Sequence, residues 1–571
     1  MPRPTFSLAR LADRLRQIPA QFLMSLCGSG LWLGTLFFAG SLTPSLVPRD
    51  GLIQGLLSGV AFALGYGIGV LLRRLWRLLH LPAWDASRIG RGSKIVAAIA
   101  CVIIAGIFLW HASEWQNSVR LAMGMPVVDS ARPILVGSVA SAVVIVIILL
   151  GRLFKRIARI ITDFVDRFAP RRVSAVIGIA LSLMLFWGIG NGVLLRAGIR
   201  TLDSSYRQLD GQFDDGLVQP ADPRKSGSDA SLLRWADLGR MGRSAIATGP
   251  TAAEITAFSG RPAMEPLRVY VGLKSAEDIE TRASLALAEM QRVGAFERSV
   301  LVIATPTGTG WLDPASQMPL EYLHHGDVAT VAVQYSYLPS WMALMVEPTY
   351  GADTARALFR KIYGYWHSLP RESRPRLYLH GLSLGALNSD LSADLFDVIG
   401  DPYHGALWSG PPFPSRTWNQ VTRERRPGSP AWLPQFRDGS VIRFTGQDNA
   451  LNRAQAPWGP MRIVYLQYAS DPITFFETQS AWRPPAWMSG PRGPDVSPEL
   501  RWYPLITFLQ LGLDLGLATT TPMGHGHVYA PEHYVDAWTA VTQPPGWSEA
   551  ERERLKQVLA QRIAEETEGG K

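Results

Sequence analysis

Residues 376–396 read RLYLHGLSLGALNSDLSADLF and contain the most informative motif in the C-terminal part of the chain. An apolar strand pattern at 376–380 runs directly into Gly-Leu-Ser-Leu-Gly at 381–385, and a helix-compatible segment follows. This order is typical of a serine on a sharp turn between a strand and a helix, where glycine neighbours leave room for the chain. We therefore expect Ser383 to be a nucleophile and the Leu384 N–H group to face a developing oxyanion. The alternative interpretation is an ordinary glycine-rich turn with a capping serine.

Strand and helix patterns alternate around this turn, over residues 267–540. The predicted strands are 268–273, 300–304, 328–333, 376–380, 405–408, 441–444 and 463–467, and helical patterns such as 276–292 and 351–368 lie between them. Such alternation is typical of a mostly parallel sheet with helices on both faces, which binds ligands beyond the carboxyl ends of its strands. The tail from Glu549 is predicted to be a helix packed on this domain, with four apolar side chains on one face: Leu555, Val558, Leu559 and Ile563.

A catalytic serine needs a general base and an acid that orients the base. In α/β-hydrolases the serine comes first along the chain, then the acid, then the histidine. Asp471 stands just beyond the predicted strand 463–467 and is the preferred acid. Asp448 is the alternative acid, and Asp514 is a less favoured one.

Two histidines share the glycine-rich loop 524–529, which reads GHGHVY. His527 is slightly preferred over His525 as the base, because a tyrosine follows it at the second position. A metal site at this pair is less favoured, since no carboxylate lies beside the histidines at a known ligand spacing. No cofactor is expected.

The second oxyanion donor is expected in the loop that follows the predicted strand 300–304. This loop reads TPTGTGW at 305–311, and its glycines let backbone N–H groups approach a substrate closely. The candidate donors are Gly308, Thr309 and Gly310.

The first 200 residues have a different composition from the rest. They carry 22 Lys and Arg against 7 Asp and Glu, whereas the remaining residues carry 34 against 40. Five long uncharged runs also occur there, at 17–48, 51–72, 95–113, 133–151 and 173–195. Each is about as long as a helix that crosses a bilayer (roughly 20 residues). We therefore expect a transmembrane domain of about five helices at 1–200, a linker at 201–230 and a catalytic domain at 231–571.

The basic residues are divided unequally between the two sides of these runs. Seventeen basic residues lie on one side: before the first run, between the second and third runs, or between the fourth and fifth runs. Only five basic residues lie in the segments on the other side. By the positive-inside rule, the N-terminus is cytoplasmic and everything after residue 200 is extracytoplasmic. The net charge of +9 is then a sign of topology, and nucleic acid is not expected as a partner.

Several segments together resemble one known family, the bacterial membrane-anchored α/β-hydrolases, which have a hydrophobic N-terminal domain and a hydrolase domain of largely unknown function. The matching segments are SLTPSLVPR at 41–49, TPTGTGW at 305–311, QYSYLPSW at 334–341, HGLSLG at 380–385, SDPI at 470–473 and GHGHVY at 524–529. The resemblance implies a serine-hydrolase fold with Ser383 as its nucleophile. The apolar runs and the charge distribution lead us to expect a multi-pass protein of a bacterial inner membrane whose catalytic domain is periplasmic.

The preferred functional interpretation is a membrane-anchored serine esterase or lipase that acts on lipid-like or envelope-derived esters. An acyltransferase that uses the same triad on envelope lipids or glycans is one alternative. A non-enzymatic scaffold or transport-associated protein is the other. Membrane lipids and a small-molecule or lipid ester are the expected partners. Aromatic-rich segments at 334–341, 482–487 and 502–508 suggest an acyl pocket or a lip at the membrane surface, or else ordinary packing.

Overall fold

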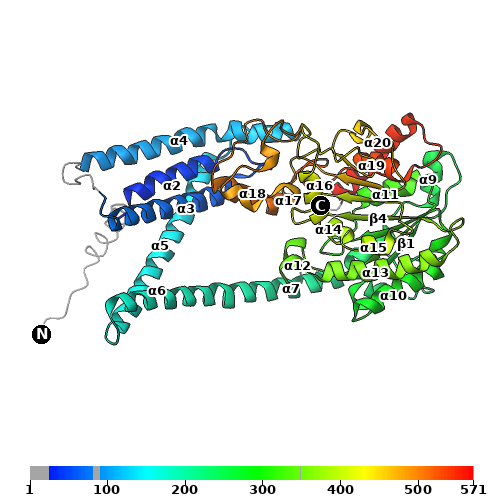
Figure 1. The fold of residues 1–571 in the computed structure, drawn as a ribbon, viewed down its shortest axis with the longest axis horizontal. Coiled ribbons are helices and arrows are strands. Elements are labelled where there is room, and N and C mark those ends of the chain that lie inside the picture. The colour runs from blue at the N-terminus through cyan, green and yellow to red at the C-terminus, as the bar shows by residue number, and fades with distance from the viewer. Residues whose placement is uncertain (1–24, 82–90, 347–348, 570–571) are drawn as a thin grey trace. The chain divides into compact units, whose positions relative to one another are not determined.

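A computed structural model describes residues 25–81, 91–346 and 349–569, and Figure 1 shows the course of the chain. The chain forms two compact units. The helical unit contains residues 1–188 together with two later segments, 478–484 and 496–514. The sheet unit contains residues 189–477, 485–495 and 515–571. Two segments from the C-terminal part of the sequence therefore belong to the helical unit. The predicted domain boundaries do not include this assignment.

Five helices make up most of the helical unit: α2 (Gly28–Ser41), α3 (Gly51–Leu78), α4 (Arg91–Ala122), α5 (Pro133–Val165) and α6 (Arg171–Trp187). In the described residues, four stretches are long and apolar enough to cross a membrane, namely Gly51–Leu78, Val96–Ala122, Pro133–Val165 and Arg171–Gly211. They match the last four predicted spans. The first predicted span, 17–48, begins outside the described residues, and its described part contains only α2.

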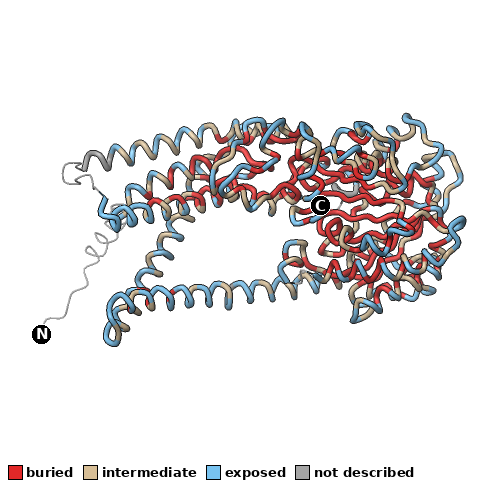
Figure 2. The backbone as a smooth tube through the Cα atoms, viewed as in Figure 1, coloured by how far each residue is buried: buried red, intermediate tan, exposed pale blue. Residues whose placement is uncertain are grey.

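Few apolar residues of α4, α5 and α6 are buried, and these helices are mostly tan and pale blue in Figure 2. Helices that are apolar on their exposed faces are suited to lipid rather than water. Where the helices do touch, small residues bring the backbones close. A Cβ on Gly69 would lie 2.4 Å from the Ser29 carbonyl oxygen of α2, and one on Gly59 would lie 2.8 Å from the Ala140 carbonyl oxygen of α5.

The segment 496–514 packs against the loop that follows α2. Gln510 donates to the Thr43 carbonyl at 2.9 Å, and the Asp514 carboxylate accepts from the Ser45 hydroxyl and the Leu46 N–H, both at 3.0 Å. Both aspartate and glutamine are buried. These side chains satisfy backbone groups of a non-helical loop that would otherwise be buried without partners.

The sheet unit is built on seven parallel strands: β1 (Leu267–Val271), β2 (Val300–Thr305), β3 (Val328–Val333), β4 (Arg376–Leu382), β5 (Gly405–Ser409), β6 (Ile442–Thr445) and β7 (Arg462–Leu466). Their order is β1-β3-β2-β4-β5-β7-β6. A strand occurs at each of the seven predicted positions, so the predicted parallel sheet is confirmed. The strands are almost wholly buried because helices cover both faces, as Figure 2 shows.

Three helices pack together on one face of the sheet, namely α11 (Pro314–Leu323), α19 (Pro531–Thr542) and α20 (Glu549–Gly569). Three others pack on the opposite face, namely α10 (Ile279–Arg292), α13 (Tyr350–Ser368) and α14 (Leu384–Asp390) (Figure 1). The remaining helices are α7 (Arg196–Gly211), α8 (Gly239–Ala247), α9 (Ala252–Ser259), α12 (Ser340–Val346), α15 (Leu395–Val398), α16 (Arg416–Arg423), α17 (Pro472–Phe475) and α18 (Ile506–Leu517), with a π-helix, η1, at Gly188–Leu195. Short 3-10 turns occur at Trp235–Asp237, Leu273–Ser275, Ala295–Glu297, Leu451–Arg453, Thr478–Ala481 and Ala486–Met488.

Two predicted segments differ in detail from the structure. The stretch 201–230 begins as helix α7, and buried Asp210 in it accepts from Gln334 at 3.0 Å. The tail helix α20 packs on its own domain as predicted, through buried Leu555, Leu559 and Ile563. Val558 is exposed, because it lies to the side of the apolar stripe.

Candidate active site

Ser383 stands on a strained turn between β4 and α14. Its backbone angles are φ 57° and ψ −126°, which residues other than glycine rarely adopt. The Ser383 N–H donates to the Ser409 carbonyl at 2.9 Å, and its own carbonyl accepts the first helical bond, from Ala386, at 2.9 Å. Neighbouring strands therefore hold the serine at the carboxyl edge of the sheet, where the sequence predicted it.

The two glycines of Gly-x-Ser-x-Gly are needed for close contact between backbones. A Cβ on Gly381 would lie 2.4 Å from the carbonyl carbon and oxygen of Gly385. A Cβ on Gly385 would lie 2.3 Å from the Thr305 carbonyl oxygen at the end of β2. Both distances are far below van der Waals contact, so each side chain would displace main chain. The glycines thus bring the nucleophile turn against the loop that follows β2.

Asp471 and His527 form a buried acid–base pair. Asp471 follows β7 and caps α17, where one carboxylate oxygen accepts from the Ile473 N–H at 2.9 Å. The other oxygen lies 2.7 Å from His527 Nδ1 and accepts from the Tyr529 hydroxyl at 2.8 Å. In the described part of the chain, His527 Nε2 has no hydrogen-bond partner. The imidazole is oriented through one nitrogen and leaves the other available for proton transfer.

Ser383 and His527 approach the same short segment, Ser409–Gly410. Ser383 is bonded to Ser409, and a Cβ on Gly410 would lie 2.6 Å from His527 Cε1. Gly410 also has a φ of +49°, which favours glycine, so the segment fits beside the imidazole without a side chain. Both predicted residues therefore lie at the carboxyl end of β5.

The other histidine of the loop has a different environment. His525 Nδ1 lies 3.9 Å from the buried carboxylate of Asp495, and Asp471 is bonded to His527 instead. Asp495 accepts from the Ser470 hydroxyl at 2.5 Å and from Gln447 at 2.6 Å. The geometry favours His527 as the base.

The Asp495 contacts also connect the two backbone segments of the acid–base pair. The Ser470 hydroxyl accepts from the Gly526 N–H at 2.8 Å. Ser470 precedes Asp471 and Gly526 precedes His527, so one hydrogen bond fixes the separation of the two segments. Asp495 holds that hydroxyl in place from the other side.

The alternative acids lie elsewhere. Asp448 is exposed in the turn after β6, where its carbonyl accepts from Thr445 at 3.3 Å. Asp514 belongs to the helical unit and is bonded to the loop that follows α2. Of the three candidate acids, Asp471 alone is hydrogen-bonded to a histidine within the described residues.

The predicted oxyanion donors are in unequal positions. Leu384 N–H is at the first turn of α14, and it has no acceptor in the part of the chain that the structure describes. Gly310 N–H donates to the Thr307 carbonyl at 2.9 Å, so the turn itself uses it. Gly308 N–H lies 3.4 Å from the Ser340 hydroxyl, a weak contact. The Gly310 N–H group is therefore engaged within its own turn, whereas the Leu384 N–H group is not bonded in the described residues.

A second buried carboxyl group, Asp313, follows the same loop. It caps α11 by accepting from the Ala315 N–H at 2.9 Å. Burial raises the pKa of the Asp313 carboxyl to about 7, against weaker lowering by the Ala315 N–H and by His527. Near neutral pH the group is partly protonated, which limits the negative charge close to the imidazole.

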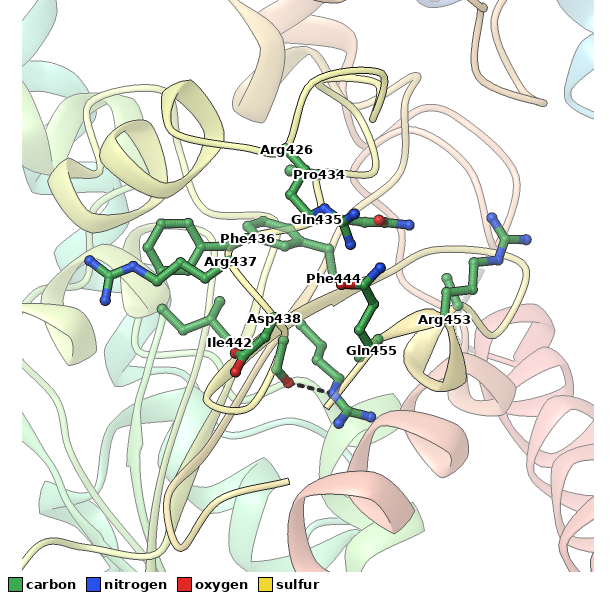
Figure 3. A pocket seen from close by; sticks show the side chains of 14 residues that line it. Arg426, Pro434, Gln435, Phe436, Arg437, Asp438, Ile442, Phe444, Arg453 and Gln455 are labelled. Atoms are coloured by element: carbon green, nitrogen blue, oxygen red, sulfur yellow. Dashed lines mark hydrogen bonds between the residues drawn. The ribbon is translucent and has the colours of Figure 1, made fainter. Parts of the chain in front are cut away.

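A separate pocket lies near the edge strand β6, at residues 426–455 (Figure 3). Ser383, Asp471 and His527 do not line it. Arg443 in its wall already donates to the carbonyls of Gly439, Leu451 and Ala456. Arg443 therefore connects the loops around the pocket by hydrogen bonds. The residues that line the pocket are separate from the candidate active site.

Three residues of the site were not predicted from the sequence: Ser470, Asp495 and Asp313. Ser470 stands next to Asp471 in SDPI, so local spacing could have pointed to it. Asp495 and Asp313 come from segments distant from both triad motifs, and their role follows only from tertiary contacts.

Comparison with known proteins finds family models that match both parts of the chain. Residues 267–555 match the family described as "Alpha/beta-hydrolase family", and residues 42–250 match "Alpha/beta-hydrolase family N-terminus". No curated protein and no solved structure matches the chain.

Proposed function

The chain belongs to the alpha/beta-hydrolase family, and from this premise we propose that it is a membrane-anchored serine hydrolase, an esterase or lipase. The observation that carries the proposal is the contact of 2.7 Å between Asp471 and His527 Nδ1, with His527 Nε2 unpartnered in the described residues. It supports a triad of Ser383, His527 and Asp471.

In the proposed reaction, the Ser383 hydroxyl oxygen attacks the ester carbonyl carbon while His527 Nε2 takes the hydroxyl proton. The carbonyl oxygen becomes an oxyanion, which Leu384 N–H and an N–H of the 308–309 backbone stabilise. The ester C–O bond then breaks, and the imidazolium gives its proton to the leaving alcohol. Water, deprotonated by the same imidazole, attacks the acyl-enzyme and releases the carboxylic acid and free Ser383.

Two features favour this chemistry over a non-enzymatic scaffold. Ser383 is buried on a strained turn, and such strain is maintained at functional sites when the surrounding contacts impose it. His527 and Ser383 also share one neighbour, the segment Ser409–Gly410, although the three come from separate parts of the sequence.

The proposed location is extracytoplasmic, on a bacterial inner membrane. The side of the membrane is inferred from the last predicted crossing, at 173–195. The stretch 152–172, which precedes it, carries seven Lys and Arg and is therefore placed in the cytoplasm. One crossing later, the catalytic domain is outside. Alkaline phosphatase fused after Lys571 is expected to be active. If a cytoplasmic reporter fused at the same position is active instead, the proposed orientation is wrong.

Hydrolysis of a panel of p-nitrophenyl esters by the purified full chain tests the function. Ser383→Ala is expected to lower kcat by at least about 10³-fold, because the nucleophile is lost. Ser373→Ala is the matched control, since this exposed serine bonds only to a local carbonyl, that of Pro370 at 3.4 Å. Equal loss in both variants, or none in Ser383→Ala, would reject the assignment.

A further inference from the structure

A short apolar helix next to the nucleophile has an exposed face that the proposed reaction does not use. In α12, Met342 and Ala343 are buried against Leu384 and Leu387 of the nucleophile helix α14. The opposite face is formed by Trp341, Met345 and Val346, which are 57%, 57% and 44% exposed. An exposed tryptophan and two exposed aliphatic side chains on one short helix are costly in water and favourable at a membrane surface.

The chain itself connects α12 to the end of a candidate span. The apolar run of that span ends at Leu195, and Arg196 and Arg200 follow it with exposed side chains. Cationic side chains in this position mark the level of the lipid headgroups. Helix α7 continues from there, and its Asp203 lies only eight residues, or about 12 Å of helix, beyond Leu195.

The segment that leads into α12 is bonded to this part of α7. The Tyr337 hydroxyl donates to Asp203 at 2.9 Å and accepts from Arg207 at 2.9 Å. Tyr206 of α7 packs against the same apolar cluster as Met342 and Leu384. Figure 1 shows α12 beside the end of α7. The start of α12 is therefore held beside Asp203 of α7, eight residues beyond the end of the apolar run, by contacts within the sheet unit.

The start of α12 also touches the predicted oxyanion loop. A Cβ on Gly308 would lie 2.7 Å from Ser340 Cα and from the Leu338 carbonyl oxygen. Thus α12 contacts the loop 305–311 through Ser340 and helix α14 through Met342 and Ala343.

We propose that α12 is a membrane-contacting helix, that Trp341, Met345 and Val346 insert into the bilayer surface, and that the ester substrate is a lipid whose acyl chain enters from the bilayer beside this helix. The proposed contact of α12 with the bilayer does not depend on the chain being an enzyme. The proposed substrate class rests on the proposed function.

Fluorescence quenching in nanodiscs tests the contact directly. The full chain with Cys27→Ser and Cys101→Ser would carry Trp341→Cys or, as the control, Val558→Cys, each labelled with an environment-sensitive fluorophore. Val558 is exposed on α20, which packs on the opposite face of the sheet from α14. Phosphatidylcholine brominated in its acyl chains is expected to quench the label at 341 by about twofold and to leave that at 558 unchanged. Met345→Cys is a second position in case Trp341→Cys does not fold.

No quenching at either α12 position, or equal quenching at α12 and at 558, would overturn the membrane contact. The substrate class is tested by comparing a long-chain p-nitrophenyl ester in phosphatidylcholine vesicles with soluble p-nitrophenyl acetate. Trp341→Glu combined with Met345→Glu is expected to lower the ratio of long-chain to acetate hydrolysis about tenfold. An unchanged ratio would overturn the substrate class. If the wild-type chain cleaves neither ester, the proposed function fails, while the quenching result still decides the membrane contact.

Discussion

Gly385→Ala is the substitution whose consequence follows most directly from the nucleophile turn. The added Cβ would lie 2.3 Å from the Thr305 carbonyl oxygen and 3.0 Å from that of Pro306. Both atoms are main chain, so α14 and the loop after β2 must separate by about 1 Å to restore contact. Overpacking of this kind costs about 3 kcal/mol, which is a large part of the stability of an ordinary domain. The same shift moves Ser383 from the loop that supplies its oxyanion donors.

The control is Gly364→Ala, the same chemical change in the exposed middle of α13. Nothing lies within 4 Å of a Cβ at this position, so alanine is expected to stabilise the helix by about 0.5–1 kcal/mol. Thermal denaturation of the full chain in detergent measures both variants, and the rate of fluorophosphonate labelling reports on the site. We expect Gly385→Ala to lower the melting midpoint. We also expect it to lower the labelling rate at least tenfold. Normal labelling and an unchanged midpoint would refute the close packing of the turn on β2.

Three further predictions concern residues around the triad. Tyr529→Phe removes a hydrogen bond to the buried Asp471 carboxylate, so the chain should lose about 1.5–3 kcal/mol of stability and kcat should fall roughly tenfold; unaltered melting and kinetics would contradict it. Asp495→Ala leaves the Ser470 hydroxyl without its acceptor and removes one of the two acceptors of the Gln447 amide, and it is expected to cost about 2–4 kcal/mol in the same melting assay, with a slower labelling rate. The raised pKa of Asp313, about 7, means that the folded state favours the protonated form, so stability should fall by up to about 4 kcal/mol as pH rises from 4 to above 7. Asp313→Asn should flatten this dependence of the melting midpoint on pH, and a wild-type midpoint that rises over the interval would show the sign to be wrong.

The strands of the sheet unit could be predicted because each is a short apolar run bounded by turn residues and buried on both faces. A run such as 328–333 has no polar face that could be confused with an amphipathic helix. The turn at Ser383 could also be predicted, since Gly381, Ser383 and Gly385 occupy fixed positions after a strand. In both cases a local sequence pattern is enough to predict the local backbone structure.

The remaining features depend on contacts that local patterns do not encode. His525 and His527 stand two positions apart with glycine before each, and only the tertiary position of Asp471 distinguishes them. Helix α18 has the apolar composition of a core helix, so its sequence does not show that most of it belongs to the helical unit, where Asp514 is bonded to the loop after α2. Gly310 was predicted to be a donor from its type alone, whereas the turn that it closes uses its N–H.

The proposed activation of Ser383 by His527 is tested by locating the adduct of a covalent probe. The full chain in detergent is treated with a fluorophosphonate probe, digested, and the adduct is located by mass spectrometry in wild type and in His527→Gln. We predict one adduct, on Ser383 in the peptide containing HGLSLG, and a labelling rate at least about 10³-fold lower in the variant. An adduct on another serine, or equal labelling of Ser383 without the imidazole, would contradict the proposed triad.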